Sequence, residues 1–166
     1  MAEAKSQTLT LETSDGRLRV EFQWQRDRFT QLLFVDSVEA GNSIEGDAAD
    51  AWPSSPPLQQ LSLEEINGSK VILGVGAAGQ GHWSISVEID HQNEGVDALK
   101  FELACRSKLQ PPFLGSTYRL ADSIVLTPTD CASQVRDGRT IAGPIDLDSQ
   151  THRWSYVLKP AGRQPT

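Results

Sequence analysis

The sequence predicts an all-β protein, folded as a single-domain antiparallel β-sandwich with little or no helix. Two features predict this class. Apolar and polar residues alternate with a period of two in several segments, and turn-forming Gly, Asn, Asp and Pro residues separate those segments. We expect about eight to ten short strands, and a flattened β-barrel is the alternative arrangement.

Residues 82–106 show the alternation most clearly. In 82–90 the apolar side chains fall on one side of an extended backbone, and in 97–106 Leu99, Phe101 and Leu103 repeat the pattern. Two such neighbouring strands form a hairpin with one apolar face. A hairpin alone buries too little apolar area to be stable, so we expect other strands, chiefly from the N-terminal third, to cover that face.

A first short hairpin is predicted around Asp15-Gly16, a dipeptide that tolerates the positive φ angles of a two-residue turn. Pairing outward from this turn sets Leu11 against Val20 on the apolar face. The same register sets Glu12 against Arg19 on the polar face. A shift of one residue would destroy both pairs, so the register is well determined.

A second hairpin is predicted around Asn67-Gly68. Its register sets Glu65 against Lys70 as a charged pair. It also sets Leu63 against Ile72 as an apolar pair.

The spelling Gly-x-Gly-x-x-Gly occurs at residues 74–79, directly after a short apolar segment. In a dinucleotide-binding fold these glycines open a helix whose amides face a pyrophosphate. Here the next strand begins at about residue 82, which leaves no room for that helix. We therefore predict a flexible glycine connector and no nucleotide cofactor.

Residues 36–60 are predicted as a long surface loop, rich in acidic residues and in proline. Trp52 lies within it. Long loops of this kind often carry function, although a tryptophan beside prolines can also fix its own loop to the body of the protein.

The negative charge of the chain is concentrated around this loop. The chain has 15 Lys and Arg against 22 Asp and Glu, but residues 29–69 contain seven acids and no Lys or Arg. This charge argues against nucleic acid and against an anionic membrane as partners. A solvated loop, a docking surface for a basic partner, and a weak divalent-cation site are the three explanations that the pattern allows.

Beyond residue 106 the pattern predicts short strands at 117–120 and 123–126, and mostly turn at 128–138, with a weak hairpin signal at Asp137-Gly138. Residues 139–148 and 152–159 are predicted to pair with each other. The resulting domain would comprise residues 8–159, with flexible ends at 1–7 and 160–166.

In the C-terminal part, the side chains that could bind a ligand or take part in catalysis are carboxylates. Asp146 and Asp148 flank Leu147 and would share the outer face of a strand, so they and Trp52 are the candidate ligand-binding residues. The three histidines are scattered and neither cysteine has a second one near it, which predicts no metal site. No catalytic motif and no cofactor-binding motif is present.

These features favour a non-catalytic binding or interaction domain, with a protein or a carbohydrate as its ligand. One alternative is a hydrolase or isomerase that acts on a carbohydrate-like substrate through acids such as Asp146 or Glu88. A second alternative is a structural subunit that pairs through an exposed sheet edge.

Location follows from the cysteines and the N-terminus. The chain has two cysteines, which we expect to be free thiols, and it starts without the pattern of a signal peptide. No apolar segment reaches the length of a membrane span. We therefore expect a cytoplasmic protein.

Overall fold

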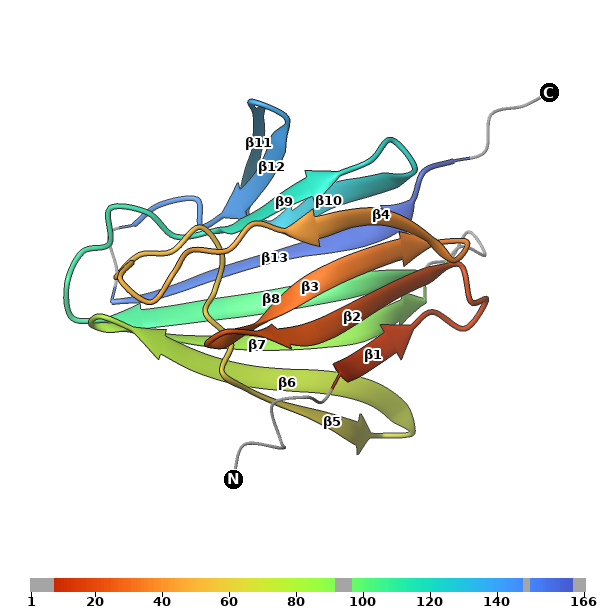
Figure 1. The fold of residues 1–166 in the computed structure, drawn as a ribbon, viewed down its shortest axis with the longest axis horizontal. Coiled ribbons are helices and arrows are strands. Elements are labelled where there is room, and N and C mark those ends of the chain that lie inside the picture. Colours follow the sequence, from red (N-terminus) through yellow and green to blue (C-terminus); the bar gives the residue numbers. More distant parts are fainter. Residues whose placement is uncertain (1–7, 92–96, 148–149, 163–166) are drawn as a thin grey trace.

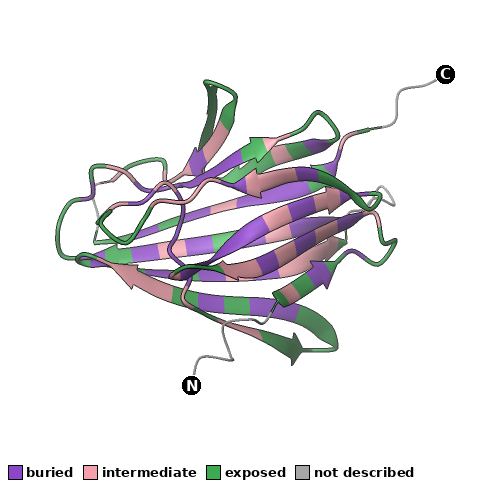
Figure 2. Cartoon of the chain, in the orientation of Figure 1, coloured by how far each residue is buried: buried purple, intermediate pink, exposed green. Residues whose placement is uncertain are grey.

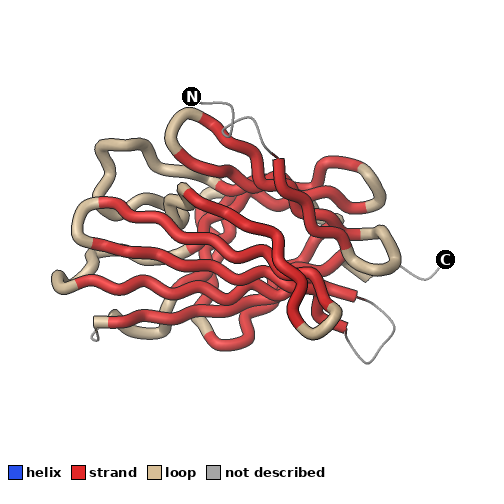
Figure 3. Tube along the Cα trace, turned by 90° about the horizontal axis from the view of Figure 1, so that it is seen from below, coloured by secondary structure: helices blue, strands red, loops and turns tan. Residues whose placement is uncertain are grey.

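The computed structural model describes residues 8–91, 97–147 and 150–162. They form two antiparallel sheets that pack face to face as a β-sandwich and are not closed into a barrel (Figure 1). No helix is present in these ranges (Figure 3), and accordingly none of them contains a helix long and apolar enough to cross a membrane. The prediction of an all-β sandwich is thus confirmed, and the barrel alternative is not found.

One sheet has seven strands. In spatial order they are β1 (Thr8–Glu12), β2 (Leu18–Gln25), β3 (Arg28–Val35), β4 (Val38–Ser43), β9 (Ser116–Leu120), β12 (Arg139–Gly143) and β11 (Ala132–Arg136). The β11–β12 hairpin extends beyond the body of the sandwich (Figure 1).

The other sheet has six strands. In spatial order they are β10 (Ile124–Asp130), β13 (Thr151–Pro160), β8 (Asp97–Ser107), β7 (Gly81–His91), β6 (Ser69–Ala78) and β5 (Gln60–Ile66). The described chain crosses between the two sheets five times, after β4, β8, β9, β10 and β12.

The predicted hairpins have the predicted registers. Leu11 pairs with Val20, Leu63 pairs with Ile72, and the 82–106 hairpin is the pair β7–β8. Buried and exposed residues alternate along these strands (Figure 2). The inward residues of both sheets form one hydrophobic core, whose largest fully buried side chains are Trp154, Tyr118, Tyr156, Phe22 and Phe101.

The glycines at 74–79 were expected to form a flexible connector, and that expectation is wrong. Gly74 and Gly76 lie inside β6, and a tight turn at Gly79, with φ of +53°, leads directly into β7. A Cβ at Gly76 would collide with the backbone oxygen of Pro57. Gly76 is therefore required because the segment before β5 passes directly against the strand.

The predicted pairing of 139–148 with 152–159 is also wrong. β12 pairs with β9 and β11 in the seven-stranded sheet, whereas β13 pairs with β8 and β10 in the other sheet. Strand β12 ends at Gly143, before Pro144, and Ile145 is 73% exposed instead of facing the core. Residues 128–138, expected as turn, contain the end of β10 and all of β11.

The prediction that residues 36–60 form one long surface loop is wrong in part, because the segment holds the strand β4 and only then runs without regular structure to β5. Although it is acidic, much of its second half is buried, including Pro53, Ser55 and Leu58. Of the predicted flexible ends at 1–7 and 160–166, residues 1–7 and 163–166 lie outside the described residues, and Pro160 is the last residue of β13.

Candidate functional site

One hollow combines charged and aromatic side chains that could bind a ligand. It lies on the outer face of β9 and β12, beside the projecting β11–β12 hairpin. Its volume is about 540 Å³. It is lined by Trp52, Ser54, Phe113, Thr117, Arg119, Arg136, Asp137, Arg139 and Ile141, which we call the arginine pocket.

One wall of the arginine pocket is the loop that carries Trp52. The Ser55 hydroxyl donates to the backbone oxygen of Thr117 at 3.1 Å and accepts from its backbone N–H at 3.0 Å. The Thr117 hydroxyl donates to the backbone oxygen of Ser54 at 2.7 Å. These bonds hold the loop against β9, so the wall is fixed by the sheet and does not depend on the loop's own stability.

Trp52 itself is half-buried. Its ring packs edge-on against Trp83, with 6.0 Å between the ring centroids and 62° between the planes. The contact fixes one side of the indole to the core, while another part lines the pocket beside Phe113. An aromatic side chain held in this way loses little conformational freedom when it contacts a ligand.

The opposite wall comes from the tip of the β11–β12 hairpin. Asp137 and Gly138 have positive φ angles of 53° and 74°, as a two-residue hairpin turn requires. The turn places Arg136 opposite Arg139, and β9 supplies Arg119 across the sheet.

Three exposed arginines thus meet in a chain whose net charge is −7. Asp137 is the one carboxylate among the described residues of the lining. Among the ion pairs of the described residues, none involves these arginines. Their guanidinium donors are therefore available to an anionic ligand.

The other two residues predicted for a ligand site are not part of this pocket. Asp146 is exposed in the segment after β12 and lines a smaller hollow of about 220 Å³ with His152 and Arg153. Asp148 lies outside the described residues. The structure therefore does not bring Trp52 and Asp146 together, and Glu88 lies apart from both, on β7 between Val71 and Lys100.

The polar face of β7 and β8 is also hollowed, with a volume of about 690 Å³, and its lining includes Ser84, Ser86 and Glu102. A sugar is bound best where an exposed aromatic ring lies beside polar groups. Trp154 belongs to the described lining but is only 1% exposed. This groove therefore presents no exposed aromatic ring among the described residues.

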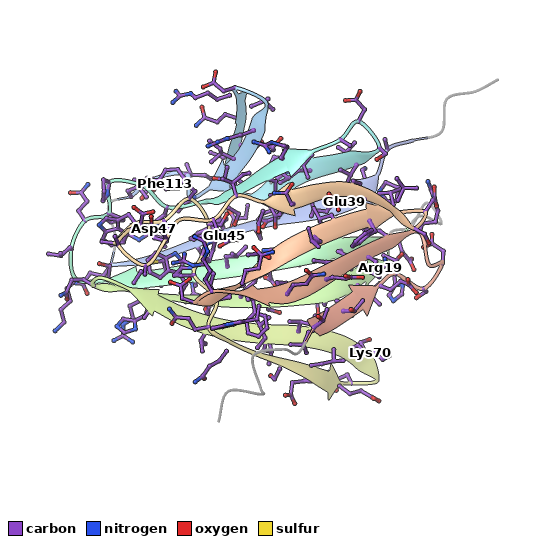
Figure 4. The ribbon with its side chains drawn as sticks, in the orientation of Figure 1. Arg19, Glu39, Glu45, Asp47, Lys70 and Phe113 are labelled. Carbon is purple, nitrogen blue, oxygen red and sulfur yellow. The ribbon has the colours of Figure 1, made fainter. Side chains whose placement is uncertain are left out.

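A third hollow, of about 690 Å³, contains a carboxyl group with altered titration. It lies between the β2–β3 turn and residues 45–49. Burial raises the pKa of Glu45 to about 7, against the lowering effect of the Ser43 hydroxyl, which donates to Glu45 Oε2 at 2.5 Å. Glu45 is the second residue after β4 and lies two residues before Asp47 (Figure 4).

The sequence identified Trp52 but neither the arginines around it nor the hollow that contains Glu45. Arg119 lies on β9 and Arg139 on β12. These strands are neighbours in the sheet but not consecutive in the chain, so no local sequence pattern reveals their pairing. The signal that was available is the sequence Arg136-Asp-Gly-Arg139, a turn dipeptide between two arginines. No group of three or more potential metal ligands is found within the described ranges.

No protein-family model matches the sequence, and neither the curated proteins nor the solved structures contain a significant match.

Proposed function

We propose that this chain is a non-catalytic protein-interaction domain, which binds an acidic segment of a partner protein in the arginine pocket. The observation that carries the proposal is the meeting of three exposed arginines with Trp52 and Phe113 around one hollow of an otherwise acidic chain. Arginine and tryptophan are the residues most enriched where protein interfaces gain their binding energy.

The chemistry of the pocket specifies the partner segment. Carboxylates of the segment would pair with Arg136 and Arg139 at the hairpin tip. An apolar side chain next to them would contact Trp52, which the core already holds in place.

We also propose that the domain acts in the cytoplasm, as its two free thiols suggest. Cys105 is buried and Cys131 is half-buried, and neither forms a disulfide. Free thiols persist in reducing compartments. Localisation of the full-length protein by immunofluorescence or fractionation tests this part of the proposal, and recovery from a secreted fraction would contradict it.

The experiment is a selection of random heptapeptides displayed on phage against the folded domain. We expect enriched peptides to combine Asp or Glu with an aromatic or large aliphatic residue. Their binding should be lost in an Arg136→Ala/Arg139→Ala variant, because both side chains are exposed and their removal leaves the sheet intact. It should persist in the matched control Arg106→Ala/Arg153→Ala, which removes two exposed arginines from the other sheet.

Two results would contradict the proposal. One is the enrichment of peptides that bind both double variants equally well. The other is the absence of any enriched peptide together with binding to acidic oligosaccharides on a glycan array, which would identify the same pocket as a carbohydrate site.

A further inference from the structure

Two residues that line the pocket between the β2–β3 turn and residues 45–49 each carry a buried polar atom with no hydrogen-bond partner among the described residues. They are Nη1 of Arg28 and Oε1 of Glu45. Arg28 is only 3% exposed. Buried polar atoms are nearly always hydrogen-bonded, so each of these two atoms calls for a partner, such as a water molecule or a ligand.

The remaining atoms of both side chains are already in use. Arg28 donates from Nε and Nη2 to the two carboxylate oxygens of Asp27, at 3.0 and 3.3 Å. Glu45 Oε2 accepts from the Ser43 hydroxyl, which also accepts from the backbone N–H of Gln31 at 2.9 Å. Each side chain is thus held in place by its other polar atoms, while Arg28 Nη1 and Glu45 Oε1 make no hydrogen bond to the described residues.

We propose that this pocket binds a small carboxylic acid, whose two carboxyl oxygens are held by Arg28 Nη1 and Glu45 Oε1. Arg28 donates to one oxygen. Because Ser43 occupies Oε2, a proton on Glu45 resides on Oε1, and it is donated to the other oxygen of the ligand. This site is separate from the arginine pocket and shares no lining residue with it.

The charges around Glu45 make the site dependent on protonation. Arg28 and Asp27 face it from β3 and the β2–β3 turn, Arg26 and Asp47 line the same pocket, and the un-ionised hydroxyls of Tyr118 and Tyr156 lie within electrostatic range.

With Glu45 neutral, the two arginines balance the two aspartates of the lining and a carboxylate is not repelled. With Glu45 ionised, the lining is net negative and Oε1 can no longer donate. The raised pKa of Glu45, about 7, places this change near neutral pH.

Binding of a carboxylate therefore requires one proton on Glu45. Below the pKa of Glu45 the proton is already present and the affinity does not depend on pH. Above it, one proton is taken up with each ligand, so the dissociation constant rises tenfold for each pH unit.

The probe is sodium acetate, titrated at constant ionic strength against the ¹⁵N-labelled domain between pH 6 and 8.5. We expect acetate to shift the amide resonances of Thr30, Gly46 and Ala48, which line the pocket. The dissociation constant should be level from pH 6 to 6.5 and about tenfold weaker at pH 8.5 than at 7.5. Acetamide and sodium chloride should produce neither response.

Two variants separate this site from a pocket that holds only water. In Glu45→Gln the amide nitrogen donates at every pH, so acetate binding should persist and lose its pH dependence above 7. Arg28→Lys keeps the positive charge beside Asp27 but removes the guanidinium group, which can donate to Asp27 and to acetate at the same time. Acetate binding should therefore fall at least tenfold. Glu39→Gln, on β4 outside the pocket, is the matched control and should behave as the unmodified chain.

The proposal is overturned if acetate shifts none of the three amides in the folded domain. It is also overturned if acetamide binds as well as acetate, or if affinity is independent of pH in the unmodified chain. Because the peptide selection uses other residues, either proposal can fail without the other.

Discussion

The hydroxyl oxygens of Tyr118 and Tyr156 lie 2.7 Å apart in the interior of the sandwich, one contributed by each sheet. Tyr118 donates its only hydroxyl proton to Gln31 Oε1 at 2.7 Å, so Tyr156 must be the donor to Tyr118. Both side chains are fully buried, and burial raises the pKa of each phenol. The two sheets are therefore joined by a directed polar contact as well as by apolar packing.

Removing either hydroxyl should destabilise the fold. Tyr118→Phe removes the bonds to Gln31 Oε1 and to the Tyr156 hydroxyl, and we expect a loss of about 2 kcal/mol. Tyr156→Phe removes the bonds of its hydroxyl to Tyr118 and to Ser116, and we expect a similar loss of about 2 kcal/mol. Urea denaturation measures both. Equal stability of Tyr118→Phe and the unmodified chain would show that the contact contributes nothing.

Glu45 should make stability fall as the pH rises through the weakly acidic range. Its pKa in the folded chain, about 7, lies above the ordinary value of 4.5, so the folded state retains a proton that the unfolded state releases. The free energy of unfolding should therefore decrease between about pH 4.5 and 7 and then level off, with a total loss of up to about 3 kcal/mol.

The comparison that isolates this effect is Glu45→Gln, which cannot ionise. The difference in stability between the variant and the unmodified chain should grow in favour of the variant from pH 5 to 7.5, in denaturant titrations at each pH. The low pKa values of Asp15 and Asp27 affect both chains alike and cancel. A difference that does not change with pH contradicts the burial of this carboxyl.

Gly76→Ala should be strongly destabilising because the new methyl group would meet the backbone of Pro57, which cannot move aside like a side chain. We expect a loss of more than about 2 kcal/mol. Gly68→Ala is the comparison, since nothing lies within 4 Å of its position and only its φ of +81° is unfavourable. That change should cost about 1 kcal/mol in the same urea titration. Equal losses would mean that the segment before β5 does not pass against β6.

The buried thiol should be unreactive in the folded chain. Burial raises the pKa of Cys105 to about 11, so almost none of it is thiolate at pH 8. In a Cys131→Ser variant, a chromogenic disulfide reagent should react with Cys105 at least a hundredfold more slowly in buffer than in denaturing urea. Similar rates in the two solvents would contradict the position of Cys105 in the core.

The parts of the fold that could be predicted are those with local signals. The Asp15-Gly16 and Asn67-Gly68 turns determine their own hairpin registers, and the alternation in 82–106 determines the central pair β7–β8. The partner of β12 could not be predicted in this way. Its register with β9 is a long-range pairing, and the apolar pattern of residues 139–148 fits a strand of either sheet.

The candidate site likewise has one residue that the local sequence indicates and others that only the fold brings to it. Trp52 was identifiable because a tryptophan in an acidic, proline-rich loop is unusual in the sequence. The arginines beside it come from β9 and from the hairpin tip, and only the folded sheet brings them together. Glu45 was likewise hidden, because its raised pKa depends on burial that no neighbouring residue in the sequence indicates.

The central claim is that the arginine pocket recognises an acidic protein segment. Isothermal titration calorimetry with the most enriched acidic heptapeptide tests it most directly, at low and at physiological salt. The account predicts a dissociation constant at least tenfold weaker for Arg136→Ala/Arg139→Ala, unchanged for Arg106→Ala/Arg153→Ala, and weaker in all chains as salt increases. Equal affinity in both double variants, without salt dependence, would contradict it.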